Sequence, residues 1–525
     1  MSELLTGNLP LIADAPDGIR TLRGLILELA VRGKLVPQDA GDEPARVLLE
    51  RIVREKARMN LGRGGKRQQS TPPAATENQP FDLPEGWVWT RLAEIALINP
   101  RNAADDSTVV SFVPMAMIGS RFEGTHEQEL RTWAEVKQGF THFAEGDVGV
   151  AKITPCFENS KACVFSGLSN GIGAGTTELH IVRPIAGTLA PRYVLAYLKA
   201  PIFLHVGVSR MTGTAGQKRL PKDFLEQNPF PLPPLAEQHR IVAKVDELMA
   251  LCDRLEAEQA DTEVAHARLV DALLAALTRS TDAADFAANW QRLAAHFDTL
   301  FTTEAAIDAL KQTVLQLATI GKLTANSHEG WETLPLDKIC QAIVDCPHST
   351  PKWTTSGKIC VRTSQFSPGK LDLSTSRFVS ESTFKERTAR LKPVANDILY
   401  SREGGILGIA CRIPEGAEIC LGQRMMLIRS GDRIIPAFLE IVLNAPLIIG
   451  LARRCTTGGA APRVNVSTIK SYPIPLPPLA EQHRIVAKVN ELTTLCDRLK
   501  ADLASARQRQ ATLADTLIAA ALEAA

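Results

Sequence analysis

The sequence predicts a mixed α/β (α+β) fold in which two globular domains are separated by two long antiparallel coiled-coil helices, as a pseudo-twofold internal repeat. Two observations lead to this expectation. A 25-residue segment occurs twice with only three differences, and apolar residues continue each copy at a four-three helical spacing. A chain of 525 residues is long enough for roughly three or four domains.

The repeat has two parts with different offsets. PLPPLAEQHRIVAKVDELMALCDRL at 231–255 recurs as PLPPLAEQHRIVAKVNELTTLCDRL at 475–499, displaced by 244 residues. IRTLRGLILELAVRGKL at 19–35 resembles IDALKQTVLQLATIGKL at 307–323, displaced by 288 residues. We therefore expect the N-terminal helix to lie beside the last helix as 307–323 lies beside the first, so that the chain closes on itself.

These repeats divide the chain into six regions. They are an N-terminal helix (1–36), an insertion helix with a linker (37–82), a first globular domain (83–230), a central helical region (231–328), a second globular domain (329–474) and a C-terminal helical region (475–525). The insertion contains the amphipathic stretch EPARVLLERIVREKARM before a Gly/Pro/Gln-rich linker. In the first globular domain, VGVAKI and ELHIVRP indicate strands and RYVLAYLKAPIFLHV indicates a helix.

The two long helices are expected to begin after paired prolines, because proline is tolerated in the first helical turn and an acid near it complements the helix dipole. The first predicted seam consists of Ile241, Val245, Leu248, Cys252, Leu255, Gln259, Thr262, His266, Leu269, Leu273 and Ala276. The second consists of Ile485, Val489, Leu492, Cys496, Leu499, Leu503, Ala506, Gln510, Leu513, Leu517 and Ala520. The equivalent polar residues His266 and Gln510 either fix the register or mark a point where the seam opens to water.

Composition indicates a folded cytoplasmic protein, with 45% hydrophobic and 22% charged residues, no apolar run near ~20 residues and no signal-like N-terminus. The ten cysteines form no CxxC pair or zinc-type cluster, so we expect reduced thiols, with Cys252 and Cys496 buried. The net charge of +1 hides a segregation. Segment 331–474 has 19 Lys and Arg against 12 Asp and Glu, whereas 235–330 has 8 against 15. This suggests a polyanion held by part of the chain, or chance segregation of solvated faces.

Residues expected on the outward face of the repeated helices are also identical in the two copies. Recent duplication would explain this, but the intervening segments have diverged heavily, which favours two copies of one partner bound to the two halves. The candidate partner-binding residues are Glu237, Gln238, His239, Arg240, Lys244, Glu481, Gln482, His483, Arg484 and Lys488. We interpret His239 and His483 as contact or capping residues rather than metal ligands, because no other ligand set lies nearby.

This layout resembles the specificity subunit of type I restriction–modification systems over essentially the whole chain. The repeated PLPPLAEQHRIVAKV is the most specific motif. The supporting motifs are LPEGWVWTRLAEI, FVPMAMIG, GDVGVAKITPCFENSKACV and TGTAGQKRLPKDFL in the first half, and EGWETLPLDKI, NDILYSREGGILGIACRI and TTGGAAPRVNVSTI in the second. The second half lacks the ITPCFEN string, so its DNA-facing details are less transferable.

The resemblance implies that each globular domain is a target-recognition domain reading one half of a split site in double-stranded DNA. It also implies that the repeated helices dock two modification (methyltransferase) subunits, which two restriction (motor–nuclease) subunits join. Because the two domains differ in sequence, the site is expected to be bipartite and asymmetric. Its half-sites are expected roughly one turn, about 10–10.5 bp, apart.

Side chains that read bases are typically Arg, Lys, Gln or Asn, above a layer of phosphate contacts. The candidate DNA-binding residues are Arg121, Lys152, Lys161, Arg210, Gln217, Lys218, Arg219, Lys352, Arg362, Gln365, Arg402, Arg424, Arg453, Arg454 and Arg463. For each of them the alternative is a solvated surface charge. Gly213, Gly216, Gly458 and Gly459 would allow close backbone approach to phosphate.

No motif for catalysis is found: the sequence has no phosphate-binding G-x-x-x-x-G-K-[ST] loop, no Asn/Asp-Pro-Pro-aromatic motif and no convincing nuclease cluster. We therefore expect a non-enzymatic chain that binds no metal or cofactor, with S-adenosylmethionine, ATP and Mg in partner subunits. The alternatives are a recognition subunit of a modification-only or other DNA-modification defence system, a self-contained methyltransferase fusion, and a coiled-coil scaffold.

Overall fold

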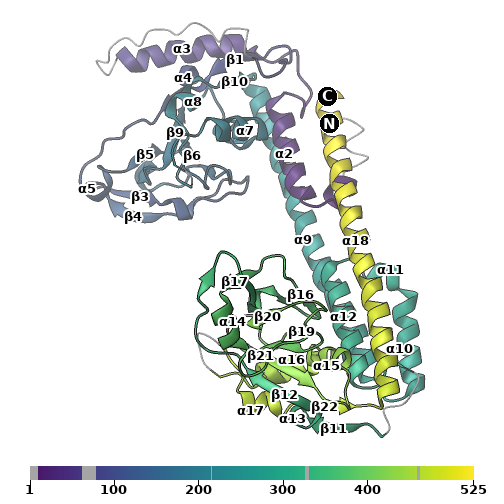
Figure 1. Ribbon diagram of the computed structural model, residues 1–525. Helices are drawn as coiled ribbons and strands as arrows, with labels where there is room; N and C mark the ends of the chain where they lie inside the picture. The colour runs from purple at the N-terminus through teal and green to yellow at the C-terminus, as the bar shows by residue number, and fades with distance from the viewer. Residues whose placement is uncertain (1–9, 62–78, 215, 325–329, 458–461, 525) are drawn as a thin grey trace. The chain divides into compact units, whose positions relative to one another are not determined.

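The computed structural model describes residues 10–61, 79–214, 216–324, 330–457 and 462–524. The chain forms two compact units, one of Met1–Asp261 with Arg507–Ala525 and the other of Thr262–Ala506 (Figure 1). Each unit contains one globular domain and parts of both long helices.

The globular domain of the first unit is built on two four-stranded sheets. Its strands are β1 (Val88–Arg91), β2 (Ala96–Ile98), β3 (Val109–Val113), β4 (Glu129–Thr132), β5 (Thr141–Ala144), β6 (Val148–Ala151), β7 (Ala162–Val164), β8 (Ile172–Gly175), β9 (Leu179–Pro184) and β10 (Pro229–Leu232). One sheet has the antiparallel order β2-β9-β6-β7. The other has the order β4-β3-β8-β5, in which β3 and β8 run parallel. The strands predicted at VGVAKI and ELHIVRP are confirmed as β6 and β9.

The globular domain of the second unit repeats this plan. Its strands are β11 (Glu332–Pro335), β12 (Cys340–Asp345), β13 (Trp353–Thr354), β14 (Lys358–Val361), β15 (Phe366–Ser367), β16 (Lys370–Leu371), β17 (Arg377–Val379), β18 (Ile398–Ser401), β19 (Ala410–Arg412), β20 (Ile419–Leu421), β21 (Met425–Ser430) and β22 (Pro473–Leu476). The sheets have the orders β12-β21-β18-β19 and β13-β17-β14-β20, and β14 and β20 run parallel. The internal repeat therefore extends through both globular domains.

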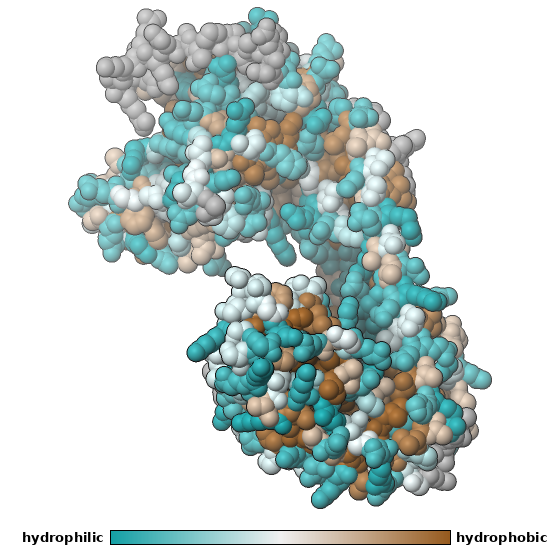
Figure 2. Space-filling view, in the orientation of Figure 1, coloured by the Kyte–Doolittle hydropathy of each residue, from teal (hydrophilic) through white to brown (hydrophobic). Residues whose placement is uncertain are grey.

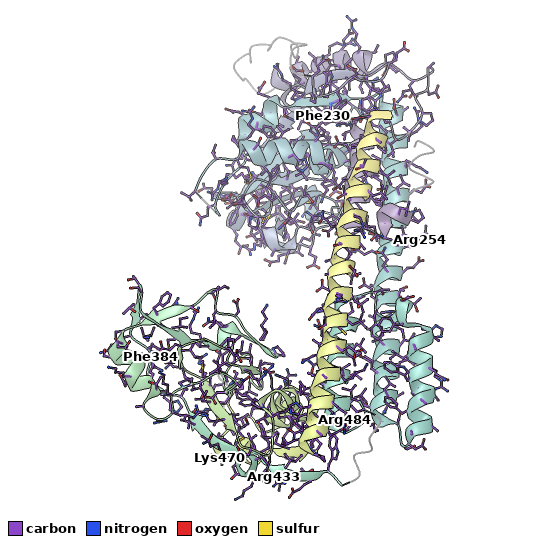
Figure 3. The ribbon with its side chains drawn as sticks, turned by 45° about the vertical axis from the view of Figure 1, so that its right-hand side comes forward. Phe230, Arg254, Phe384, Arg433, Lys470 and Arg484 are labelled. Atoms are coloured by element: carbon purple, nitrogen blue, oxygen red, sulfur yellow. The ribbon has the colours of Figure 1, made fainter. Side chains whose placement is uncertain are left out.

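A short antiparallel strand pair closes each domain just before its long helix. Val88 of β1 pairs with Leu232 of β10, and Glu332 of β11 pairs with Leu476 of β22, so both partners are displaced by the predicted 244 residues. The side chain of Phe230, labelled in Figure 3, is fully buried in this junction. The register match shows that the repeated sequence encodes the same local structure twice.

The helices fall into three sets. The first globular domain carries α4 (Leu92–Ile95), α5 (Trp133–Val136), α6 (Pro191–Lys199), α7 (Pro201–Arg210) and α8 (Lys222–Gln227). The second carries α13 (Leu336–Ile339), α14 (Glu381–Thr388), α15 (Pro436–Leu443), α16 (Pro446–Arg454) and α17 (Val466–Lys470). Outside the globular domains lie α2 (Gly18–Val31), α3 (Ala45–Leu61), α9 (Leu235–Arg279), α10 (Ala283–Ala295), α11 (Phe297–Leu300), α12 (Glu304–Thr319) and α18 (Leu479–Ala524).

The two long helices α9 and α18 pack together within each unit. In the first unit Cys252 of α9 shares an apolar core with Ala514 and Ala521 of α18. In the second unit Leu274 of α9 shares a core with Cys496 of α18. The first part of α9 thus packs against the last part of α18, and the last part of α9 packs against the first part of α18. This is the antiparallel order that the sequence predicted.

Helices α2 and α12 occupy equivalent places, as their sequence similarity predicted. Lys34, just after α2, donates its Nζ to the Leu522 carbonyl of α18 at 3.3 Å. Lys322, just after α12, donates its Nζ to the Thr278 carbonyl of α9 at 2.9 Å. The N-terminal helix therefore lies beside the last long helix as α12 lies beside the first.

In the later part of both long helices, the predicted seam is wrong: the buried residues lie one position further along the chain. Leu269 and Leu513 are about half exposed, whereas Leu274, Leu277 and Ala514 are buried. A straight α-helix has 3.6 residues per turn and drifts by ~20° per heptad from a strict 3.5-residue repeat. The buried stripe follows the helix instead of the heptad, and it shifts in the same direction in both copies.

Two further helical expectations change in the structure. The stretch predicted as one helix is two, because Pro201 begins α7 directly after α6 ends at Lys199. Helix α10 was not predicted, although Phe286, Trp290 and Leu293 mark an apolar face within it. The insertion helix is confirmed as α3, while the linker residues 62–78 lie outside the described part of the chain.

Among the described residues, no single helix is both long and apolar enough to cross a membrane; α15 and α16 reach that composition only as a pair bent by 56°. All ten cysteines are unpaired, and Cys252 and Cys496 are buried as expected. Within the same described ranges, no group of three His, Cys, Asp or Glu side chains could hold a metal ion. Figure 2 shows a largely hydrophilic surface with apolar patches on the face drawn.

Candidate nucleic-acid interface

In the first domain three loops meet where β6 ends and β9 begins. The Lys152 amide donates to the Glu178 carbonyl at 2.9 Å, and the Leu220 amide donates to the Lys152 carbonyl at 2.7 Å. Thr212 and Arg219 exchange backbone hydrogen bonds at 3.0 and 2.8 Å and so close a small hairpin. We call residues 152–154, 178, 212–214 and 216–219 the first loop edge; residue 215 lies outside the described part of the chain.

The second domain builds the same backbone framework. The Arg402 amide donates to the Arg424 carbonyl at 3.1 Å, and the Val464 amide donates to the Arg402 carbonyl at 3.0 Å. Thr457 and Arg463 exchange hydrogen bonds at 2.9 and 3.0 Å. We call residues 402–404, 424 and 457–463 the second loop edge, of which 458–461, with Gly458 and Gly459, lie outside the described residues.

Four of the candidate DNA-binding residues in the first domain lie on the first loop edge. Gln217, Lys218 and Arg219 are exposed, and Lys152 is partly exposed. Arg219 donates to both carboxylate oxygens of Glu178 at 2.9 to 3.3 Å. The hydrogen bonds from Arg219 lower the pKa of Glu178, so this pair is ionised at neutral pH.

The other three candidates of the first domain lie elsewhere. Arg210 is exposed in the last turn of α7. Arg121 is exposed and Lys161 is partly exposed, with its Nζ donating to the Met115 carbonyl at 3.1 Å. Arg121 and Lys161 line a groove of about 1230 Å³ that also includes residues of α2, α7 and α18.

Lys199 was missed by the sequence reasoning, and it organises this groove. Its buried Nζ donates to the carbonyls of Ser120, Arg121 and Ser160 at 2.7 to 3.1 Å. Burial lowers the pKa of Lys199 to about 8. It therefore joins two loops of the domain from inside, which a lysine in a helix sequence does not reveal by itself.

Two candidates of the second domain are internal. Arg402 is 7% exposed and donates to both carboxylate oxygens of Asp345 at 2.9 Å, with a further ion pair to Glu403 at 3.0 Å. Gln365 is 3% exposed, accepts from the Arg362 amide and donates to the Asp372 carbonyl, both at 2.9 Å. The expectation that Arg402 and Gln365 face DNA is therefore corrected, because their polar groups are used inside the domain.

The remaining candidates of the second domain keep outward positions. Lys352, Arg424, Arg453, Arg454 and Arg463 are exposed, and Arg424 has a left-handed backbone with φ of 68°. Arg362 is partly exposed, and its Nη2 donates to the Thr375 carbonyl at 3.3 Å. The second loop edge therefore presents Arg424 and Arg463, with Arg453 and Arg454 in the last turn of nearby α16.

The need for glycine at position 213 comes from the local backbone and not from the expected approach to phosphate. Its φ is 130°, and a Cβ there would lie 2.7 Å from the Gln217 carbonyl oxygen. The hairpin itself requires glycine at this position, whereas Gly216, with φ of 80°, has open space around it.

The first two candidates on each repeated helix are buried, contrary to the outward position expected for them. Glu237 is 1% exposed and accepts hydrogen bonds from Trp87 Nε1 at 2.9 Å and from Gln38 Nε2 at 3.1 Å. Burial raises the pKa of the Glu237 carboxyl, against the effect of these bonds. Glu481 is also buried and accepts from the Thr324 hydroxyl.

Gln238 and Gln482 are fully buried and attach each globular domain to its helix. Gln238 accepts from the Ala190 amide at 2.9 Å and donates to the Pro233 carbonyl at 3.0 Å. Gln482 accepts from the Ile435 amide at 2.8 Å and donates to two carbonyls. The prediction failed because these glutamines face the domain that precedes each helix, whereas the exposed side of the turn carries Ala236 in α9 and Ala480 in α18.

The other candidates on the helices remain at least partly exposed. His239 and His483 are exposed, and Lys244 and Lys488 are partly exposed beside acidic residues three positions later. Arg240 pairs with Asp42 at 2.7 Å in the first unit, whereas Arg484 pairs with Glu481 of its own helix. Figure 3 labels Arg484 near the start of α18.

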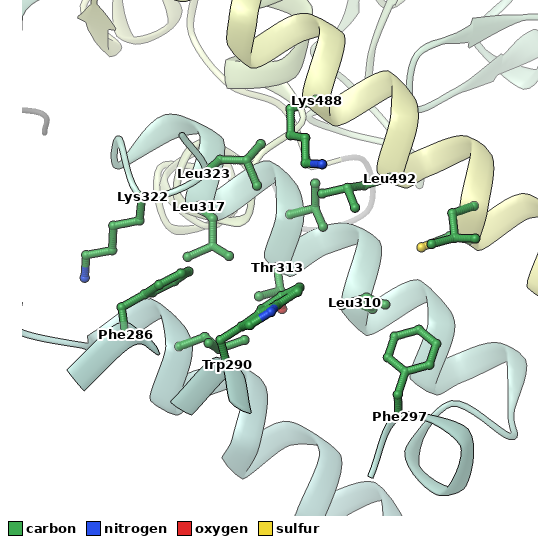
Figure 4. Close-up of a pocket in the computed structure, with 14 residues that line it drawn as sticks. Phe286, Trp290, Phe297, Leu310, Thr313, Leu317, Lys322, Leu323, Lys488 and Leu492 are labelled. Carbon is green, nitrogen blue, oxygen red and sulfur yellow. The ribbon is translucent and has the colours of Figure 1, made fainter. Parts of the chain in front are cut away.

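An apolar pocket of about 300 Å³ lies in the second unit, and Lys488, one of the candidate partner-binding residues, is among the residues that line it (Figure 4). Phe286 and Trp290 of α10 and Leu310 of α12 line it, together with α9, α11 and α18. None of its lining residues belongs to the sheets of the globular domain.

Exposed basic residues on both loop edges of a duplicated domain favour a protein that binds nucleic acid, and comparison with known proteins identifies the family. The family model described as the type I restriction modification DNA specificity domain matches residues 84–265 and 328–505. The chain therefore belongs to the specificity subunits of type I restriction–modification systems, the DNA-recognition component of those systems.

Two Escherichia coli proteins extend this similarity over the whole chain. The chain is 40% identical to the specificity subunits of type I restriction enzymes EcoAI and EcoEI, over 96% of this chain and 94% of each of them. A solved structure described as the structural basis of complex assembly and conformational transition of the type I R-M system shares the fold. Its TM-score is 0.56 at 20% identity, covering 84% of this chain and 99% of that one.

Proposed function

We propose that this chain reads a bipartite, asymmetric DNA site, one half with each globular domain, and directs adenine methylation and cleavage by partner subunits. The observation that carries the proposal is the pair of loop edges. They share one backbone framework but carry different side chains, such as Glu178 in one and Arg424 in the other. A fixed framework with exchanged side chains suits the reading of two different sequences.

The proposed partners are double-stranded DNA, two modification subunits and two restriction subunits. The surfaces proposed for the modification subunits, one in each unit, are His239, Arg240 and Lys244 in the first and His483, Arg484 and Lys488 in the second. S-adenosylmethionine, ATP and Mg are assigned to the partners, and catalysis is theirs. The relatives support this assignment by their names as subunits of restriction enzymes.

The proposed DNA-binding surface is the two loop edges with the outward basic residues near them. It retains Lys152, Gln217, Lys218 and Arg219 in the first domain, and Arg424, Arg453, Arg454 and Arg463 in the second. The alternative function is recognition for a modification-only or other DNA-modification defence system. A restriction activity that depends on this chain would separate the two.

The test is sequencing of modified bases in a host that lacks other methylation and expresses this chain with a modification subunit. We expect methyl-adenine at one split asymmetric motif, lost when this chain is omitted. Exchange of residues 83–230 for those of another specificity subunit should change one half of the motif only. An unchanged motif after this exchange would contradict the proposed roles of the domains.

A further inference from the structure

Glu178 and Arg424 occupy the same place in the two recognition domains. Glu178 directly precedes Leu179 of β9, which pairs with Ala151 of β6. Arg424 directly precedes Met425 of β21, which pairs in the same way with Ser401 of β18. Their carbonyls accept the equivalent backbone hydrogen bonds described above, so the position is structurally identical and the charge is reversed.

In the first domain the carboxylate of Glu178 binds one side of the Arg219 guanidinium. Nε and Nη2 of Arg219 donate to the two carboxylate oxygens of Glu178, with distances of 2.9 to 3.3 Å. A guanidinium has five N–H groups. Both N–H groups on Nη1 and the second on Nη2 have no acceptor among the residues that the structure describes.

The exposed fractions of the two side chains show which side of the pair faces solvent. The Arg219 side chain is 47% exposed, whereas that of Glu178 is 24% exposed. The carboxylate therefore lies on the inner side, and the end of the guanidinium that carries Nη1 and Nη2 is the more accessible. Two parallel donors held at a fixed angle match the O6 and N7 acceptors that guanine presents in the major groove.

Among its described residues, the second loop edge has no such pair. Arg424 replaces the carboxylate, and Arg463 stands at the place of Arg219. Among the residues that the structure describes, Arg463 has no side-chain hydrogen bond or ion pair. Two arginines of like charge cannot orient one another as a carboxylate does, so this edge suits contacts with phosphate better than fixed readout of one base.

We propose that Glu178 and Arg219 form a preassembled guanine-reading pair of the first recognition domain, with Glu178 as the positioning residue for Arg219. The inference rests on the proposed function, because it names the base that this domain reads through Arg219. Preassembly matters because an arginine already held by a carboxylate loses less side-chain freedom when it binds a base. The pair therefore adds selectivity that a free surface arginine lacks.

The experiment measures initial methylation rates of the full complex, this chain with its modification subunits, on DNA randomised at each position of the site. The variants are Glu178→Gln and Arg219→Lys. Glu127→Gln is the matched control, since Glu127 is an exposed carboxylate of the same domain outside the loop edge. Lysine keeps the positive charge of arginine but lacks its two parallel donors.

We expect Arg219→Lys to reduce preference for guanine at one position of the first half-site by roughly 10- to 100-fold. Glu178→Gln should reduce preference at the same position, by a smaller factor. The second half-site and the Glu127→Gln control should be unchanged. Equal binding of the variants to the modification subunits shows that both are folded.

Three results would contradict the proposal that Glu178 and Arg219 read guanine as a pair. Full selectivity in Arg219→Lys would mean that Arg219 acts as a charge on phosphate. Altered selectivity in Arg219→Lys with none in Glu178→Gln would remove the positioning role of Glu178. A uniform loss of methylation rate in both variants, without a change of base preference, would mean that the Glu178–Arg219 contact is structural only. If the unsubstituted complex methylates no split motif, the proposed function itself fails, and the inference fails with it.

Discussion

The start of the repeated helices and the loop edges are both duplicated, but they behave in opposite ways. Gln238 and Gln482 are identical, fully buried and bound to the backbone of their own domain. Glu178 and Arg424 differ in charge and lie at the surface on one shared framework. At these two pairs of positions, the identical glutamines are used for internal attachment, whereas the positions that differ in charge reach the surface.

The same contrast appears between equivalent positions within the loop edges. Lys152 and Arg402 have equivalent backbone partners in their own domains, yet Lys152 is partly exposed and Arg402 is paired with Asp345 and Glu403. A basic residue at equivalent backbone positions is thus partly exposed in one domain and internal in the other. Charge alone does not distinguish the two roles, because the distinction depends on the acids nearby in space.

The largest predicted effect is the difference in stability between substitutions of Arg402 and of Lys152. Arg402→Ala should destabilise the second unit by about 3–5 kcal/mol, because the largely buried Asp345 loses both hydrogen bonds from Arg402. Lys152→Ala should change stability by less than about 0.5 kcal/mol, because it removes no described ion pair. Hydrogen exchange of β18 and β6 amides measures both effects. Similar losses in the two variants would contradict the different roles assigned to these residues.

The second prediction concerns the shifted seam of α9. Leu274→Ala should destabilise the second unit by about 2–4 kcal/mol, because Leu274 is buried in its helical core. Leu269→Ala should cost less than about 0.5 kcal/mol, because Leu269 is half exposed. Urea unfolding followed by circular dichroism compares the variants. The reverse order would restore the strict heptad that the sequence first suggested.

The third prediction tests whether the two helix starts are true equivalents. Gln238→Ala and Gln482→Ala should each cost about 1–3 kcal/mol, because each leaves buried backbone groups without their partners. The loss should appear in the first unit for Gln238→Ala and in the second for Gln482→Ala. Hydrogen exchange resolved by peptide locates it. His239→Ala, at an exposed neighbour, is the control and should leave protection unchanged.

The sequence was sufficient for the repeat, the long helices and the place of α2, because these depend on local periodicity and on similarity between distant segments. It was insufficient where a side chain acts through a partner far away in the chain. Asp345 and Arg402 are 57 residues apart, and Glu178 and Arg219 are 41 apart. No spacing rule connects such pairs, so Glu178 was not identified and Arg402 was assigned to the surface.

The smallest predicted effect concerns the pH dependence of the first loop edge. The pKa of Glu178 is lowered in the folded chain by the hydrogen bonds from Arg219, relative to an ordinary value of 4.5. The pair therefore contributes stability that is complete above pH 4.5 and is lost as the pH falls through the lowered pKa. Protection of the Thr212 and Arg219 amides, corrected for intrinsic exchange, should decrease over that acidic range. Glu178→Gln should remove this dependence, and the Thr457–Arg463 hairpin should lack it, because Arg424 stands where the first edge has its carboxylate. An equal acid response in both hairpins would mean that other carboxylates dominate and that Glu178 does not stabilise the first edge.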